Sequence, residues 1–393
     1  MAKIFPYLYF VLILSVYLIG QLEIPGLPFN VLQTITLATL FSCILIDKKI
    51  LWDKNVGIYF AFLVFYFLSS VLSGDGLSYI KFITSTIIIS YAGYWGTKVL
   101  LSESHSLTPL ILSLTIIGIL DVIVTIAQAL GLPIATSLVF LLQNQDNMQV
   151  VVNTGYELGS AVSGFFLNPV FNGHALLFCF VISLLLLKSR FKLIGITSAI
   201  CILGGLFYCQ QRSAFFLCLL VVVFLSLKYM RNNAKLKILI IFVTLVAIFY
   251  VVPKLVDYVD DTGSRILDTS STHRDVIWKA ALGYLSDNLI FGGFFDFCRI
   301  TGYYPHNFIL SSFLCGGLVG GFALLYLIFS KVKQAISNYV TLSNSNYSAL
   351  IASFLFIALT ADSFLHNTGM ADGDFAVFVA LALLTYSSEL NEG

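Results

Sequence analysis

The stretch LTPLILSLTIIGILDVIVTIAQAL, residues 107–130, decides the fold class of this chain. An α-helix needs about 20 consecutive apolar residues to cross the hydrocarbon core of a bilayer. This stretch is long enough and apolar enough to do so. Apolar stretches of the same kind recur from one end of the chain to the other. The sequence therefore predicts an all-α polytopic membrane protein.

The composition agrees with this prediction. Of the 393 residues, 59% are hydrophobic and only 10% are charged, and the mean hydropathy is +0.94. Soluble proteins have about a quarter of their residues charged, so a soluble protein is excluded. A membrane β-barrel is excluded as well, because its strands would alternate apolar and polar residues. The net charge of +1 gives no indication of a nucleic-acid partner.

The hydropathy pattern predicts about twelve transmembrane helices in a single integral membrane domain over residues 1–393. The first span resembles the apolar core of a signal peptide, but only Lys3 precedes it and no small-residue cleavage site follows. We therefore expect it to be retained as a helix. The predicted spans are 5–20, 29–46, 56–73, 79–101, 107–130, 165–187, 191–210, 212–228, 236–253, 307–330, 347–365 and 373–388.

Lysine and arginine predict the orientation of these spans. With the N-terminus in the cytoplasm, 14 of the 21 basic residues fall on the inner side, and the short outer loops hold only Lys81 and Arg212. Both termini are therefore expected inside. Two connections, 131–164 and 254–304, are too long to be turns, and both fall outside. Long loops among short ones are usually functional. Within the second, residues 275–286 predict a short amphipathic helix on the membrane surface.

Arginine and lysine are distributed differently across the predicted topology. Only three of the fifteen lysines lie outside, whereas four of the six arginines do: Arg212, Arg265, Arg274 and Arg299. A guanidinium grips a phosphate through two parallel hydrogen bonds and stays charged. A lipid phosphate or pyrophosphate would explain such a cluster. The alternative is that these are scattered, solvated charges, above all Arg299. Arg212 sits where two spans meet with almost no loop, where a charge is usually functional.

The segment GYYPHNFILSSFLCGG, residues 302–317, opens an apolar helix with a proline, a histidine and an asparagine. Proline is favoured at the first helical position, so we expect His306 in the first turn, near the positive end of the helix dipole. This position and nearby arginines would lower the pKa of the ring. A neutral imidazole can act as a general base. The alternative is a structural or capping histidine.

Three further ionisable residues are candidates to support such a site. Asp362 and His366 lie four residues apart near the outer end of a span, so we expect both on one helix face. They either support the site or pair with each other for structural reasons. Glu157, in the first outer loop, either approaches the site or is a solvated loop charge.

The remaining polar residues in the spans have simpler interpretations. Asp372 and Asp374 are expected to cap the last helix, and His174 is expected to be a packed or hydrogen-bonded helix residue. The histidines are dispersed, and neither HxxxH nor CxxC occurs. The sequence therefore indicates no metal site and no cofactor.

The segment from Arg274 to Gly321 resembles the shared signature of bacterial O-antigen polymerases and O-antigen ligases. That signature has an arginine, a tryptophan one turn later, a glycine pair, and a His-Asn pair that opens a helix followed by glycines. GFFLNPVFNGH, residues 164–174, is similar to the Asn-Pro segment of the family, with Asn168 as its asparagine, and QQRSAFF is similar to its arginine-serine turn. The matching positions are Arg274, Trp278, Gly292, Gly293, His306, Asn307, Gly316, Gly317, Gly320 and Gly321.

The resemblance implies a GT-C-like membrane glycosyltransferase in the bacterial inner membrane. It would act at the periplasmic face on undecaprenyl-pyrophosphate-linked glycans, by metal-independent, inverting transfer. Arg212, Arg265 and Arg274 would hold the donor pyrophosphate, His306 would activate the acceptor hydroxyl, and Asn307 would orient that hydroxyl. A chain-length regulator and a flippase of the same pathway would be partners. The expected function is that of an O-antigen polymerase, with donor and acceptor both carried on lipid.

Two alternatives remain open at this point. An O-antigen ligase shares the fold, donor and motif but transfers the glycan to the lipid A core, and the residues do not separate it from a polymerase. A flippase for the same lipid-linked glycans would also have about twelve spans. It would need no large outer loop, however, and its charges would line a central cavity.

Overall fold

The computed structural model is α-helical throughout the part of the chain that it describes, and that part contains no β-strand. Of the predicted spans, 236–253 lies outside this part. The described residues are 4–19, 30–47, 53–102, 107–142, 162–166, 169–209, 211–229, 274–342, 346–366 and 369–386.

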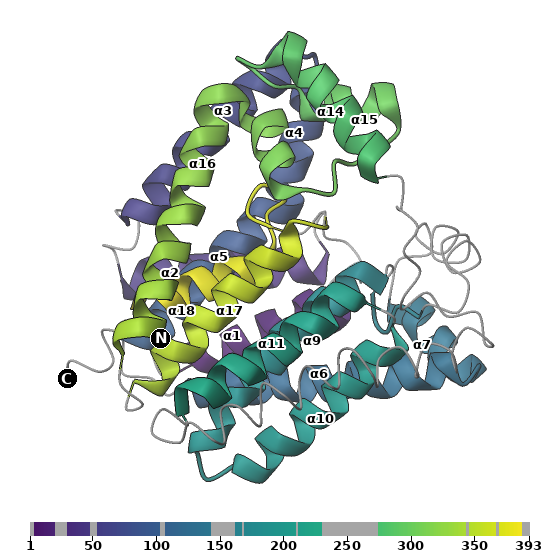
Figure 1. Ribbon diagram of the computed structural model, residues 1–393, viewed down its shortest axis with the longest axis vertical. Helices are drawn as coiled ribbons and strands as arrows, with labels where there is room; N and C mark the ends of the chain where they lie inside the picture. The colour runs from purple at the N-terminus through teal and green to yellow at the C-terminus, as the bar shows by residue number, and fades with distance from the viewer. Residues whose placement is uncertain are drawn as a thin grey trace.

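Each of the other eleven predicted spans coincides with a helical segment (Figure 1). Short π-helical or 3-10 segments extend three of the helices, at Ser15–Ile19, Ile83–Ile87 and Leu184–Lys188. The α-helices are α1 Phe5–Leu14, α2 Val31–Ile46, α3 Lys54–Leu72, α4 Gly76–Phe82, α5 Ile88–Ser102, α6 Thr108–Ala129, α7 Pro133–Leu142, α9 Pro169–Ser183, α10 Lys192–Tyr208, α11 Arg212–Tyr229, α14 Arg274–Asn288, α15 Phe294–Thr301, α16 Phe308–Thr341, α17 Tyr347–Ser363 and α18 Phe375–Tyr386.

Four helical segments are long and apolar enough to cross a membrane: Lys54–Leu72, Leu110–Ala129, Pro169–Lys188 and Phe308–Thr341. Several shorter helices, such as α17 and α18, are equally apolar in character. The chain therefore has the helices of an integral membrane protein. The count of twelve spans remains a prediction.

Helices α9, α17 and α18 form the centre of the bundle. Nearly every residue of each is buried, as expected for helices that are hydrophobic on all sides. Helices α6, α10 and α11 pack on α9, while α5 packs on α18 and α16 packs on α17. Figure 1 shows α17 between the α9–α11 group and the α3–α16 pair. The polar residues at the ends of these central helices are therefore brought together.

Helix α16 covers the predicted span 307–330 but folds back on itself at Gly317, which was not predicted. Gly317 has φ +58° and ψ −159°, a conformation that only glycine adopts readily. A Cβ built on Gly321 would lie 3.2 Å from Cα of Phe313, although eight residues of straight helix span about 12 Å. The rings of Phe313 and Phe322 are 5.3 Å apart. The arm 308–316 thus returns alongside the arm 318–341.

A turn between α14 and α15 fills the break in α16. The backbone N–H of Gly293 donates to the carbonyl oxygen of Leu314 at 2.7 Å, and that of Leu318 donates to the carbonyl oxygen of Ile290 at 3.2 Å. These bonds satisfy backbone groups that the reversal frees from the helix. A side chain at Gly292 or Gly317 would overlap the opposing backbone. The two glycine pairs of the motif therefore permit a backbone-to-backbone contact.

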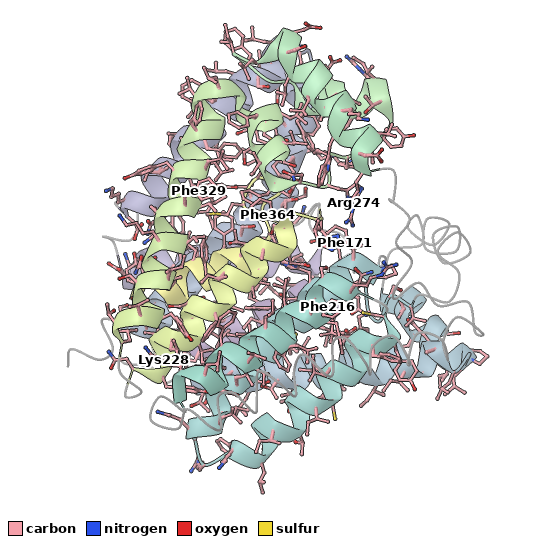
Figure 2. The ribbon with its side chains drawn as sticks, in the orientation of Figure 1. Phe171, Phe216, Lys228, Arg274, Phe329 and Phe364 are labelled. Atoms are coloured by element: carbon pink, nitrogen blue, oxygen red, sulfur yellow. The ribbon has the colours of Figure 1, made fainter. Side chains whose placement is uncertain are left out.

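The predicted amphipathic helix of the second outer loop is present as α14. It buries Ile277, Ala281 and Leu285, which recur every four residues on one face. Val276 and Leu282 lie outside this buried face and are exposed. Helix α15 follows and buries Phe294 and Phe297. Residues 274–304 thus form a folded arm, and Arg274 lies at the first position of its helix α14 (Figure 2).

Candidate active site

The segment that carries His306 is joined to α14 by the side chain of Trp278. The indole N–H of Trp278 donates to the carbonyl oxygen of Pro305 at 3.0 Å, and Pro305 itself is buried. Trp278 lies one turn after Arg274 on the same helix. The bond therefore holds the start of α14 next to the His-Asn pair.

His306 precedes its helix and is not part of the first turn, so that expectation is wrong. Helix α16 begins at Phe308, and Asn307 is its N-cap residue. His306 has φ +47°, and among the described residues it is the only one other than glycine with positive φ. The helix starts after Asn307 rather than at Pro305. The asparagine side chain accepts hydrogen bonds from backbone N–H groups of the first turn that otherwise lack partners. Such backbone conformations cluster at functional sites.

Asn307 uses both ends of its amide within the protein. Its Oδ1 accepts from the backbone N–H groups of Ile309 and Leu310 at 3.0 and 3.2 Å. Its Nδ2 donates to the carbonyl oxygen of Phe364 at 3.3 Å, and the rings of Phe308 and Phe364 meet edge to face at 4.4 Å. Asn307 therefore joins the start of α16 to the end of α17 and fixes the position of its neighbour His306.

Arg274 and His306 are close enough to influence each other's charge. Burial lowers the pKa of His306, and the nearby Arg274 guanidinium lowers it further. The direction agrees with the sequence prediction, but burial rather than the helix dipole is the main cause. The ring is therefore neutral near pH 7 and can accept a proton. Figure 2 places Arg274 at the end of its helix, toward Phe171 and Phe364.

Arg274 is half-buried, and no described carboxylate lies within ion-pair distance of it. Burial lowers the pKa of its guanidinium, Asp362 opposes this shift, and the like charge of Arg212 adds to it. Arg212 and Arg274 therefore belong to one neighbourhood, although long stretches of chain separate them. Two guanidinium groups in a half-buried position attract an anion with more than one negative charge.

Arg212 is the first residue of α11, and its neighbour Ser213 connects this helix to α17. The hydroxyl of Ser213 lies 2.8 Å from Nε2 of His366, and the same nitrogen lies 3.6 Å from Oδ1 of Asp362. His366 follows the end of α17 and is 5% exposed. Burial lowers the pKa of His366 to about 4, so its ring is neutral. The predicted proximity of Asp362 and His366 is confirmed.

A buried ion-pair network underlies these residues. Nδ1 of His174 lies 2.8 Å from Oδ2 of Asp362, and Nε2 lies 3.4 Å from Oδ1 of Asp374. Asp374 also accepts from the backbone N–H of Val377 at 3.0 Å, which confirms it as a cap of α18. Asp372 is not seen to cap: one of its oxygens is buried without a hydrogen-bond partner. The expectation that His174 is a packed or hydrogen-bonded helix residue is confirmed by its bond to Asp362. Its connection with the candidate site was not predicted.

A second buried polar cluster holds the segment 162–166. The backbone N–H of Phe165 donates to Oδ1 of Asp121 at 2.8 Å, and Gln128 bonds both backbone groups of Gly164. The amide of Asn172 lies against Asp121. No spacing pattern in the sequence predicts this cluster, because its members come from α6, α9 and the segment before α9. It positions the end of the first predicted loop.

The remaining predicted site residues divide into two groups. Glu157, Asn168 and Arg265 lie outside the described residues. Arg299 is 64% exposed on its side chain and pairs with Asp296 at 2.5 Å and with Asp75 at 3.9 Å. Arg299 is therefore a surface charge, as one of the two sequence interpretations held.

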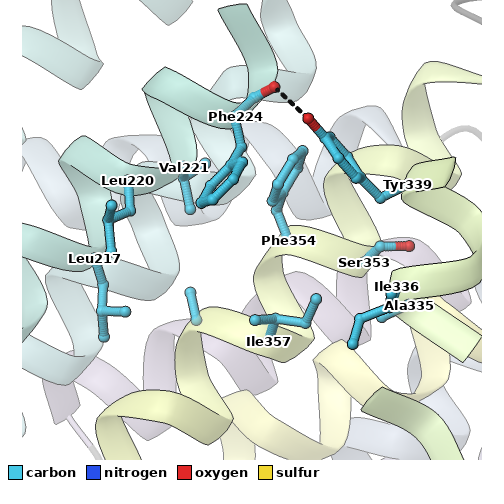
Figure 3. A pocket seen from close by; sticks show the side chains of 11 residues that line it. Leu217, Leu220, Val221, Phe224, Ala335, Ile336, Tyr339, Ser353, Phe354 and Ile357 are labelled. Carbon is cyan, nitrogen blue, oxygen red and sulfur yellow. Dashed lines mark hydrogen bonds between the residues drawn. The ribbon is translucent and has the colours of Figure 1, made fainter. Parts of the chain in front are cut away.

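An apolar cavity of about 250 Å³ lies apart from the charged cluster, between α11, α16 and α17 (Figure 3). Its lining includes Leu217, Phe224, Tyr339 and Phe354, and the Tyr339 hydroxyl donates to the carbonyl oxygen of Phe224 at 3.4 Å. Among its described lining residues there is no carboxylate, histidine or arginine. The groups suited to proton transfer and anion binding are instead those around Arg274 and His306.

The contacts of this cluster lie at one end of the helix bundle. They join the N-terminal ends of α9, α11, α16 and α18 to the C-terminal end of α17, all predicted to be periplasmic. At the opposite ends, three lysines lie over tyrosine rings at about 5 Å: Lys98 over Tyr386, Lys188 over Tyr347 and Lys228 over Tyr339.

No protein-family model matches this chain, and no curated protein matches it either. The likeness to O-antigen polymerases and ligases therefore rests on the motif residues.

Proposed function

We propose that this protein is an O-antigen polymerase with about twelve spans and a GT-C-like architecture. It joins undecaprenyl-pyrophosphate-linked oligosaccharide repeat units at the periplasmic face of the bacterial inner membrane, with both termini in the cytoplasm. The observation that supports this most is the neutral, half-buried imidazole of His306 next to the guanidinium of Arg274. That pair combines a base with an anion site, which glycosyl transfer from a pyrophosphate requires.

Arg274 and Arg212 hold the donor pyrophosphate in this proposal. The bond between the anomeric carbon and the pyrophosphate oxygen breaks, and the leaving group takes the electron pair. The negative charge that develops on the leaving group is stabilised by the two guanidinium groups. Such charge stabilisation is most effective where fixed donors sit in a partly dry site. On the sequence resemblance, Arg265 would also hold the pyrophosphate, and Glu157 is a candidate to support the site.

His306 receives the acceptor proton. The acceptor hydroxyl oxygen forms the new bond to the anomeric carbon from the face opposite the pyrophosphate, which inverts the configuration. Its proton passes to the neutral ring of His306, whose lowered pKa keeps it free to accept one near pH 7. The products are a lipid-linked glycan longer by one repeat unit and polyprenyl pyrophosphate. Asn307 acts through the backbone by fixing the position of His306.

A deletion strain tests the proposal. Loss of a polymerase leaves single repeat units on the lipopolysaccharide, and the wild-type gene restores the ladder of chain lengths. Arg274→Lys keeps the positive charge but cannot form two parallel hydrogen bonds to a phosphate. We therefore expect the amount of polymerised chains to fall about tenfold or more. Unattached polymer on its lipid carrier would indicate a ligase, and substrate retained on the cytoplasmic side would indicate a flippase. Either phenotype would overturn the proposal.

A further inference from the structure

His174 and Asp362, which form a network with Asp374, are too deeply buried to touch a substrate. His174 is 3% exposed and Asp362 is 1% exposed. Three helices meet there, because His174 lies on α9, Asp362 on α17 and Asp374 at the start of α18. Buried ionisable groups in a membrane protein are costly and usually functional. Any function of this network must therefore act through other residues.

The geometry sets the charge of the network. Nδ1 of His174 is hydrogen-bonded to Oδ2 of Asp362 at 2.8 Å, and Nε2 lies within ion-pair distance of Oδ1 of Asp374, at 3.4 Å. Two carboxylates this close favour the imidazolium form of the ring. One cation between two carboxylates leaves a net negative charge of about one. Asp362 lies near enough to Arg274 to favour the charged guanidinium. The network is therefore the buried counter-charge of the arginine neighbourhood.

The network also reaches the start of α11. Oδ1 of Asp362 lies 3.6 Å from Nε2 of His366, and this nitrogen lies 2.8 Å from the hydroxyl of Ser213. Arg212 directly precedes Ser213. Through these contacts the network bears on both arginines, on Arg274 by charge and on Arg212 by position.

We propose that His174 is a positioning residue for the anion site formed by Arg212 and Arg274. Its positive charge offsets one of the two carboxylates, so the net charge next to the two guanidinium groups stays near minus one. A larger negative charge there would compete with the anion for the guanidinium groups, and a smaller one would compete less. Preorganised charge of this kind avoids reorganisation when the substrate binds. The inference rests on the proposed function only in naming the anion as the pyrophosphate of a lipid-linked glycan.

The experiment measures the binding of inorganic pyrophosphate to the purified full chain in detergent, by calorimetry and by the shift in melting temperature. His174→Gln removes the cation and leaves two facing carboxylates beneath the arginines. We expect its pyrophosphate affinity to fall about tenfold or more, since residues that hold the ligands of an ion site in place commonly contribute this much. Asp374→Asn keeps the helix cap and removes one negative charge. Its affinity is expected to rise about twofold or more.

A control separates this role from a merely structural one. Tyr9→Phe removes buried bonds between α1 and α5, to the carbonyl oxygen of Gly93 and to Thr97, away from the site. It should lower the melting temperature and leave pyrophosphate affinity unchanged. Wild-type affinity in both His174→Gln and Asp374→Asn would overturn the positioning role, even if both variants were less stable. If the His174→Gln variant fails to accumulate, an unchanged or weaker pyrophosphate affinity of Asp374→Asn would by itself overturn the positioning role.

The proposed function can fail separately. Wild-type protein that binds pyrophosphate through a His174-dependent site but restores no polymer in the deletion strain would overturn the polymerase and leave the positioning role intact. If wild-type protein restores polymer but His174→Gln leaves the pyrophosphate affinity unchanged, the positioning role is overturned and the polymerase proposal stands. Wild-type protein that binds no pyrophosphate would overturn both.

Discussion

The indole of Trp278 donates to the backbone carbonyl of Pro305 at 3.0 Å and so connects the two halves of the candidate site. On one side lies α14 with Arg274 at its first position, and on the other lies His306. Neither residue is held by its own helix alone. The distance between the anion-binding group and the base is therefore set by a contact between α14 and the segment before α16.

Trp278→Phe should reduce polymer formation by about tenfold or more, because a small displacement of a reacting group has large effects on rate. Stability should change by only about 1 kcal/mol, the contribution of one hydrogen bond. Polymer ladders and the melting temperature of the purified variant check this. Trp95→Phe is the matched control, since the indole N–H of Trp95 has no hydrogen-bond partner among the described residues. Equal activity of the two variants would contradict the role of the contact.

Gly317→Ala should destabilise the protein and lower its level in the membrane. The backbone conformation alone is expected to cost about 1–3 kcal/mol, and the added Cβ would overlap the carbonyl of Ile290. Gly204→Ala is the control, because Gly204 is helical and has open space around its Cα. We expect it to be neutral or slightly stabilising. Fluorescence-detected gel filtration after heating compares the two, and equal stability would show that α16 does not reverse at Gly317.

Hydropathy explains why most of the fold could be predicted and why this reversal could not. A bilayer demands long apolar runs, so eleven of the predicted spans coincide with helices. The residues around Gly317 are apolar, and an apolar run suits a helix that continues straight as well as one that turns back. Hydropathy therefore cannot distinguish the two. The glycine pairs were noted as a motif, but only the contact with Ile290 reveals what they permit.

The candidate site, like the fold, could be predicted from the sequence only in part. His306 and Arg274 could be identified from residue type, predicted side and motif order. His174 could not, because its partners Asp362 and Asp374 lie on other helices and sequence spacing carries no information about contacts between helices. The capping of α16 by Asn307 was missed for a local reason: Pro305 and Asn307 both signal a helix start, and the structure uses the asparagine.

The rate should depend on pH through His306. Its pKa lies below the usual 6.5, so the ring stays neutral and active at pH 6.5 and loses activity only as the pH falls through the lowered value. Protonation is unfavourable in the folded state, so stability also falls as the pH drops below 6.5. Arg274→Gln removes one cause of the shift, and the acid limb of its residual activity should move to higher pH. An unmoved limb would assign the titration to another group.

Asn307→Ser should retain the cap of α16 and lose the bond to Phe364. We expect stability within about 1 kcal/mol of wild type, with activity reduced, because His306 is then held from one side only. Asn307→Ala loses the cap as well and should be less stable than Asn307→Ser by about 1 kcal/mol. Thermal unfolding and polymer ladders of the two variants provide the comparison. If Asn307→Ser kept full activity, the link to α17 would have no part in positioning His306.

The central claim is that Arg274 and His306 carry out glycosyl transfer between lipid-linked repeat units, and reconstitution tests it most directly. Purified protein in liposomes receives lipid-linked repeat units alone, with no lipid A core acceptor and no divalent metal. We predict that the wild type forms polymer on the lipid carrier, and that His306→Ala and Arg274→Ala, folded to the same extent, form about a hundredfold less. Polymer formation by His306→Ala at the wild-type rate, or none by the wild type, would contradict the claim.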